Sequence, residues 1–263
     1  MAITTLDGYI GARKIIVVQK KTASITSVAQ QITSPFAAAG IPGAGVLAGT
    51  STAAGVVPTD ATAGCPVISD FAGGTTGYIT RLNGYSSVAG TILLCDLLFK
   101  AGAYAFNANV TLADQPSYVG RVPAGGWGST IILLEAVTAH TGNQSIRILY
   151  TDGDDVARDT GVIATGVAPI IGRCYQVPLV GAGNGVKRID QVISSVSTAG
   201  TFNVLVVRLL AQMRIPVVGY AEARDLYGTG MPIIYQDSAL AVYVRPDSTA
   251  SGLPEWEIEI ANG

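Results

Sequence analysis

The residues of this chain that could do chemistry are few and scattered. His140 is the only histidine, in a Thr-Ala-His-Thr-Gly stretch that predicts an exposed turn. A Ser-His-Asp site needs the histidine within reach of both a nucleophile and a carboxylate. No such set can be assembled around one turn histidine. We therefore expect no catalytic residue and predict that the protein is not an enzyme.

The densest cluster of carboxylates is Asp152-Gly153-Asp154-Asp155. Carboxylate oxygens in a glycine turn are ligands that Ca²⁺ prefers. The segment lacks the twelve-residue spacing and the closing glutamate of an EF-hand loop. Asp152, Asp154 and Asp155 are therefore no more than a weak candidate calcium site, and we expect no metal and no cofactor.

Three glutamates alternate with apolar residues near the C-terminus. Glu255, Glu257 and Glu259 are predicted to share one face of a strand over 254–261, whose other face is apolar. Paired carboxylates can hydrolyse glycosidic bonds, so a polysaccharide hydrolase using Glu255 and Glu257 is an alternative. Consecutive outward glutamates more simply keep a terminal strand soluble.

The elements that must position these residues are repeated along the chain. Ala89-Gly90-Thr91 recurs as Ala199-Gly200-Thr201, and Ser145–Tyr150 aligns with Glu255–Ile260, both at an offset of 110 residues. Self-similarity of this length indicates a duplicated unit. Its short apolar runs between Gly and Asn turns are typical of sandwiches or barrels.

We accordingly predict an all-β fold with two tandem, internally duplicated β-sandwich domains of jelly-roll type. They would cover residues 49–155 and 156–263, after an extended N-terminal arm of residues 1–48.

The expected strands follow the apolar runs. In the first copy they are 78–84, 91–98, 104–112, 130–138 and 145–151, and in the second 186–193, 201–210, 215–220, 240–245 and 254–261. A helical turn is expected around 6–10, a strand over 14–19 and a short helical run over 221–227.

Two of these strands, 91–98 and 201–210, are almost continuously apolar and should be covered on both faces. The cover could come from the arm, from the sister domain or from another subunit.

The composition is apolar without a membrane span. Hydrophobic residues make up 49% of the chain and charged residues 13%, and the mean hydropathy is +0.42. No apolar run approaches the roughly 20 residues that cross a bilayer, and we expect no signal peptide, because no basic segment precedes an apolar run near residue 1. Apolar surface of this extent is often buried between subunits. We expect a homo-oligomer, with a trimer of duplicated units as the suggested symmetry, and no membrane partner.

Charge is unevenly distributed. The net charge is −2, which gives no steering toward nucleic acid. Residues 1–48 carry four cations against Asp7 alone. A basic arm on an acidic body could dock on a neighbour. The predicted partner-contact residues are Arg13, Lys14, Lys20, Lys21, Ile15 and Val17.

The cysteine count is three, with no C-x-x-C pair. Cys65 and Cys174 occupy matching positions of the two copies. A bridge between them is possible, although free buried thiols are the commoner case.

Four stretches of the chain resemble structural proteins of tailed-bacteriophage virions: Met1–Ile10, Ala53–Asp60, Asp96–Pro123 and Arg245–Gly252. The resemblance runs over nearly the whole chain. It implies a capsid-associated decoration or cement protein, located in the virion after assembly in the host cytoplasm. Its partners would be the major capsid protein or other virion proteins, and it carries no catalytic residue over.

An alternative within the virion is a tail or fibre component with carbohydrate-binding loops. Exposed loop aromatics such as Trp127 or Tyr227 would support it.

Overall fold

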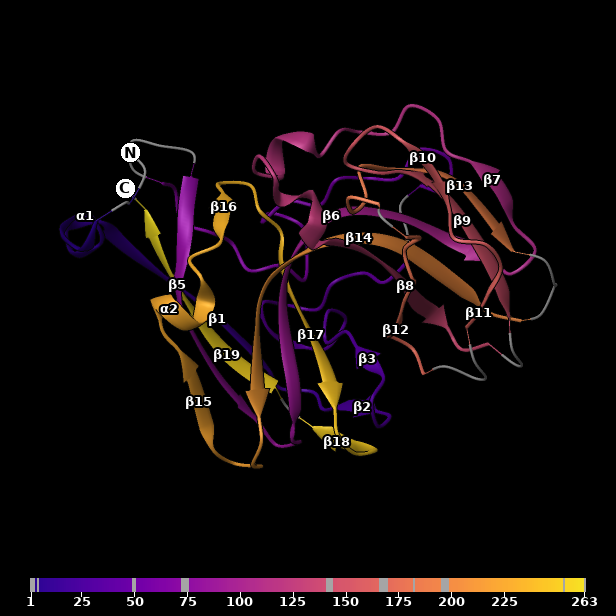
Figure 1. The fold of residues 1–263 in the computed structure, drawn as a ribbon. Coiled ribbons are helices and arrows are strands. Elements are labelled where there is room, and N and C mark those ends of the chain that lie inside the picture. The colour runs from indigo at the N-terminus through magenta and orange to yellow at the C-terminus, as the bar shows by residue number, and fades with distance from the viewer. Residues whose placement is uncertain are drawn as a thin grey trace.

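The computed structural model is built almost entirely of strands (Figure 1). It describes residues 3, 5–48, 51–71, 76–140, 144–165, 170–181, 183–194, 199–252 and 254–262. The all-β class expected from the sequence is confirmed. No helix in this part of the chain is long and apolar enough to cross a membrane.

The strands form three main sheets. The first sheet has the order β15 (Ala221–Arg224), β5 (Thr76–Ser86), β19 (Pro254–Asn262), β1 (Arg13–Lys21) and β4 (Gly40–Ile41), with β16 (Ile233–Tyr235) also on β5. The second sheet has the order β10 (Ala157–Asp159), β9 (Ser145–Thr151), β13 (Arg188–Ser194) and β7 (Asn109–Thr111), with β11 (Ile163–Ala164) also on β9.

The third sheet closes on itself in the order β12 (Arg173–Gln176), β3 (Ile32–Thr33), β17 (Leu240–Pro246), β6 (Gly90–Ala105), β14 (Thr201–Ile215) and β8 (Thr130–Thr138). The remaining elements are β2 (Ile25–Ser27) paired with β18 (Ala250–Gly252), the helices α1 (Leu6–Gly11) and α2 (Leu226–Thr229), and the 3₁₀ turns η1 (Val119–Arg121) and η2 (Gly126–Ser129).

The long antiparallel pair β6 and β14 runs through the middle of the molecule and joins its two lobes (Figure 1). At one end, Ile92 and Met213 pack in a core with Ile258 of the first sheet. At the other end, Tyr104 and Phe202 pack in a core with the second sheet. One pair of strands therefore contributes to the hydrophobic cores of both lobes.

Both outer sheets draw strands from both halves of the sequence. In the first sheet β5 pairs with β19, and in the second sheet β9 pairs with β13. The proposed division into residues 49–155 and 156–263 stays a prediction, and the strands of these two segments alternate in space.

The cover over β6 comes from within the chain. Lys100 of β6 exchanges backbone hydrogen bonds with Val56, and its Nζ donates to the Val46 carbonyl at 2.7 Å. The Tyr104 hydroxyl donates to the carbonyl of Thr52 at 2.8 Å. The small-residue stretch before β5 thus lies along the end of β6. Ile92, Leu94 and Leu98 of the apolar run are at most 1% exposed in the single chain, so the run needs no second subunit to cover it.

Most expected strands are found, with differences at bends. The predictions 130–138 and 145–151 coincide with β8 and β9. The expected strand over 215–220 is wrong, because β14 ends at Ile215 and the chain turns before β15. The helical run over 221–227 is also wrong, since residues 221–224 are strand β15 and only α2 is helical.

Candidate functional site

The outer face of the first sheet is an exposed surface that spans three adjacent strands. Across it, β1, β19 and β5 place Lys20, Glu255 and Tyr85 in one row. The next row holds Val18, Glu257 and Asn83. The ladder hydrogen bonds of the three adjacent strands fix the register of these outward side chains.

Apolar side chains stand exposed on this face. Ile16 and Val18 of β1 are 48% and 40% exposed, and Tyr85 of β5 is 39% exposed. Val18 and Tyr85 line one shallow depression together with Glu255 and Glu257. Ile41, Val217, Val218 and Tyr220, all more than half exposed, lie on β4 and on the turn between β14 and β15.

The three glutamates of β19 are each bound to a partner. Lys20 Nζ lies 3.1 Å from Glu255, and Arg81 Nη2 lies 3.0 Å from Glu257. The Tyr9 hydroxyl donates to Glu259 at 3.0 Å. Burial and this hydrogen bond raise the pKa of Tyr9. The glutamates therefore belong to a charge-paired surface, and nothing in their arrangement separates an acid from a base as a hydrolase needs.

The predicted contact residues on β1 divide between two faces of the strand. Ile15 and Val17 are 5% and 4% exposed and pack into the core beneath the first sheet. Because side chains alternate along a strand, Ile16 and Val18 point outward in their place. The assignment of Ile15 and Val17 as partner-contact residues is therefore corrected, because both are buried and the apolar side chains that β1 exposes are Ile16 and Val18.

The four cations of the N-terminal segment also differ in their placement. Arg13 Nη1 donates to the Asp70 carbonyl at 2.6 Å, and Lys14 Nζ lies 3.9 Å above the Tyr9 ring. Lys20 reaches Glu255 on the outer face. Lys21 is only 2% exposed, and its Nζ donates to the Pro42 carbonyl at 2.9 Å. Burial lowers the pKa of Lys21. Residues 13–21 are thus an inner strand of a sheet, and the extended arm expected from the sequence is not seen in this stretch.

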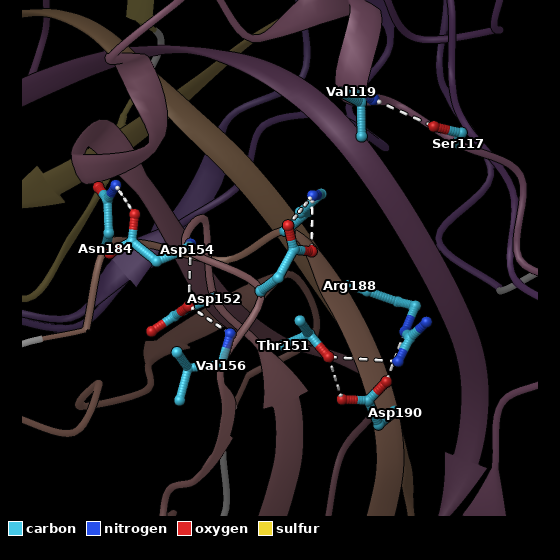
Figure 2. Close-up of polar contacts among 11 residues, drawn as sticks. Ser117, Val119, Thr151, Asp152, Asp154, Val156, Asn184, Arg188 and Asp190 are labelled. Atoms are coloured by element: carbon cyan, nitrogen blue, oxygen red, sulfur yellow. Dashed lines mark hydrogen bonds and ion pairs between the residues drawn. The ribbon is translucent and has the colours of Figure 1, made fainter.

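The acidic segment after β9 is a hydrogen-bonded turn (Figure 2). Asp152 is fully buried, and its Oδ1 accepts from the backbone N–H groups of Asp154 at 2.9 Å and Val156 at 3.0 Å. Its Oδ2 accepts from Arg158 at 2.7 Å. Despite burial, which raises it, the pKa of Asp152 is lowered by these hydrogen bonds.

The neighbouring carboxylates point to other partners. Asp154 accepts from Asn184 Nδ2 at 3.0 Å, and Asp155 lies 2.6 Å from Lys187 Nζ. Within the described residues no three His, Cys, Asp or Glu side chains gather as metal ligands would. These contacts show that the carboxylates of the acidic turn hold the folded chain together, and they do not favour a calcium site.

His140 is buried, contrary to the exposed turn expected from the sequence. It is 5% exposed, and its ring centroid lies 4.5 Å from that of Phe106. The turn composition gave no sign of this contact, because Phe106 is brought over His140 by the distant strand β6.

The three cysteines are free and buried. Cys65, Cys95 and Cys174 all belong to the core inside the closed sheet. Burial raises the pKa of the Cys65 thiol to about 12. The bridge considered between Cys65 and Cys174 is not formed.

The two aromatics considered for glycan binding differ in exposure. Trp127 is partly buried, with its ring edge against Tyr118 at a centroid distance of 6.4 Å. Tyr227 of α2 is 87% exposed and lines a groove with Leu6 and Tyr9 of α1. Only Tyr227 offers a free ring face.

Comparisons with known proteins give little more. No protein-family model and no curated protein matches the chain. Among solved structures, the chain is similar to the infectious bursal disease virus Gx strain at 9% identity, with a TM-score of 0.18, covering 95% of this chain and 81% of that one. It is also similar to the infectious bursal disease virus VP2 subviral particle at 11% identity, with a TM-score of 0.19, covering 95% and 80%. Similarity at these TM-scores is too low to bear on the fold or the function.

Proposed function

We propose that the chain is a non-enzymatic structural protein of a tailed-phage virion, a decoration or cement protein that binds the major capsid protein or another virion protein. The observation that supports this best is the outer face of the first sheet, where Ile16, Val18 and Tyr85 stand exposed among paired charges. An apolar centre with a polar rim is the usual composition of a protein interface.

The paired charges on this face would orient a partner that binds there. The Lys20–Glu255 and Arg81–Glu257 pairs are 38–58% exposed, so each contributes little to folding. On contact with a neighbour, such charges set the register and suppress wrong partners. The binding free energy would come from burying the apolar side chains between them.

Self-association would likewise bury exposed apolar side chains between paired charges. A homo-oligomer, with a trimer as the first model, would present several copies of this face to a shell of matching symmetry. Light scattering on the purified protein, with and without a chelator, measures its molar mass. A defined oligomer unaffected by the chelator is the expected result.

The experiment that tests the proposal is binding to virion shells assembled without this protein. The paired change Ile16→Lys and Val18→Lys removes the apolar centre. Across the β1–β19 ladder these positions face Glu259 and Glu257, so the new lysines gain opposite charges and the fold should persist.

The matched control is Val162→Lys, at a valine that is 73% exposed between β10 and β11 of the other lobe. Co-sedimentation with shells should fall at least about tenfold for the β1 variant and stay unchanged for the control. Equal binding by both variants, with native circular dichroism, would refute a role for this face.

A glycan-binding tail component is a second candidate, favoured by Tyr227 at 87% exposure. An exposed aromatic ring beside a groove is a suitable platform for a sugar ring. Loss of glycan-array binding in Tyr227→Ala, but not in Tyr220→Ala on the other end of the first sheet, would support it. Tyr220 is a fair control because it is 67% exposed.

A further inference from the structure

A cluster of buried charge lies between the two lobes and carries an excess positive charge. Arg121 and Arg208 are 4% and 2% exposed, and the carboxylate of Asp96 is fully buried between them. Asp96 Oδ1 binds Arg121, and its Oδ2 lies 3.5 Å from Arg208 Nη2. Ser238 donates its hydroxyl to the same Oδ2 at 3.0 Å. Two guanidinium groups thus share one carboxylate.

Backbone carbonyls accept hydrogen bonds from some of the other N–H groups of these two arginines. Arg121 donates to the carbonyls of Pro58 and Leu97, and Arg208 Nη2 donates to that of Ile233 at 2.7 Å. These dipoles solvate the guanidinium groups but do not neutralise them. Burying an uncompensated charge is costly, which favours the arrival of an anion.

The Nε–H groups of both arginines lack an acceptor among the described residues, and both atoms are buried. A guanidinium has five N–H donors in a fixed fork, and buried donors are nearly always paired. Burial lowers the pKa of Arg208, Asp96 raises it and Arg121 lowers it, which agrees with two cations competing for one carboxylate.

A cavity of about 390 Å³ has Arg121 of this cluster in its wall, whereas Asp96 and Arg208 lie outside its lining. Its wall includes the hydroxyl-bearing side chains of Ser117 and Tyr235, and the turn at Gly120. One acid, the exposed Asp237, also lies on the wall. The wall therefore combines an arginine with two hydroxyl-bearing residues, which are residue types that recognise oxyanions.

We propose that this cavity binds an oxyanion, a phosphate or carboxylate group, beside Arg121, where it offsets the excess positive charge of the buried Arg121–Asp96–Arg208 cluster. The site is independent of the outer face of the first sheet. Binding should stabilise the folded chain, because an anion that binds only the native state raises its free energy of unfolding.

Inorganic phosphate and glutarate are the two probes, each titrated into the purified protein against sodium chloride of matched ionic strength. Isothermal calorimetry and the thermal midpoint should show saturable binding that sodium chloride does not reproduce. A response to phosphate alone assigns a phosphate group, and a response to glutarate alone assigns a carboxylate.

Gly120 allows a matched pair of variants. A Cβ placed there meets no atom within 4 Å, and its backbone is not in the left-handed region, so alanine fits and a longer side chain starts from open space. Gly120→Glu puts a carboxylate at the mouth of the cavity and should weaken anion binding about tenfold or more. Gly120→Ala should bind as the unaltered protein does.

The proposal is overturned if neither anion binds saturably to the unaltered protein. It is also overturned if Gly120→Glu binds as tightly as Gly120→Ala. Arg121→Lys keeps the positive charge but loses the forked N–H donors of the guanidinium, so it should bind the anion more weakly. This result supports the proposal only if the circular dichroism of the variant is native.

Discussion

Leu97 of β6 stands directly opposite Val207 of β14, and the two residues are 110 positions apart in the sequence. This is the offset at which the two halves of the chain resemble each other. The matching positions of the two halves therefore meet at the centre of the long antiparallel pair, as on a local two-fold axis.

The outer sheets repeat the same relationship. Ile258 pairs with Leu82 in the first sheet, and Ile148 pairs with Val192 in the second. Ile258 lies 110 positions after Ile148, and Val192 lies 110 positions after Leu82. The register shift in β5 falls at Thr80, and that in β13 falls at Asp190, again 110 positions on. Equal registers and equal bulges are what a duplicated chain predicts, and here each lobe takes strands from both halves.

The first prediction concerns the independence of the two halves. Residues 49–155 and 156–263, produced separately, should each remain unfolded, because each sheet loses strands it cannot replace. Far-ultraviolet circular dichroism and NMR amide dispersion measure this. Mixing the two fragments with residues 1–48 present should recover strand signal. A single fragment that unfolds cooperatively would contradict the strand exchange.

The second prediction concerns the centre of the β6–β14 pair. Leu97 is 3% exposed and Val207 is fully buried. Leu97→Ala should cost about 2–5 kcal/mol of unfolding free energy. Because the two residues face each other, Leu97→Ala and Val207→Ala should be non-additive by about 0.5–3 kcal/mol in a double-mutant cycle. Denaturant unfolding followed by Trp fluorescence gives the values, and strict additivity would argue against their contact.

The third prediction concerns the thiols. Burial raises the pKa of Cys65 to about 12 and also raises those of Cys95 and Cys174, so little thiolate is present at pH 8. Alkylation by iodoacetamide should be slow in the native protein and rapid for all three in denaturant, as counted by mass spectrometry. Reductant should leave the thermal midpoint unchanged, because the structure holds no disulfide among its cysteines.

Local patterns predicted much of this fold. The alternation along 254–261 correctly placed Trp256 inward, and strands β8 and β9 were found at their bounds, because each is long and regularly patterned. The burial of His140 and the exchange of strands between halves could not be predicted. Both depend on contacts between residues far apart in the sequence, which no local period encodes.

The candidate surface was predicted only in part. The cations and apolar residues of β1 were singled out, but the wrong apolar pair was chosen. Ile15 to Val18 are all apolar, so the sequence does not show which of their side chains point toward the core. In the structure, pairing with β19 determines which side chains of β1 point inward. The Arg121–Asp96–Arg208 cluster gave no sequence signal at all, since its members come from three distant elements.

The fourth prediction concerns metal. Both oxygens of Asp152 are used by backbone N–H groups and by Arg158, so Ca²⁺ has no free ligand there. Neither calcium nor a chelator should move the thermal midpoint. Asp152→Asn should lower it, because Arg158 loses the charge of its buried carboxylate partner. A midpoint that rises with calcium in the unaltered protein and not in Asp152→Asn would overturn this interpretation.

The fifth prediction concerns acid. Hydrogen bonds from Arg147 and from the backbone of Gly161 lower the pKa of Asp159 to about 2. A carboxyl with a lowered pKa stabilises the fold above its unfolded value of about 3.9, and this contribution disappears as the pH falls toward its folded value. The slope of unfolding free energy between about pH 4 and pH 2 should therefore be smaller in Asp159→Asn than in the unaltered protein.

The control for this measurement is Asp225→Asn, in the N-cap of α2, where the amide can still accept from the Gly228 N–H. Urea unfolding at a series of pH values gives the slopes. Because Arg147 and Asp159 are 43% and 39% exposed, the effect should shrink with added salt. A slope unchanged by Asp159→Asn would show that the Arg147 contact does not persist in solution.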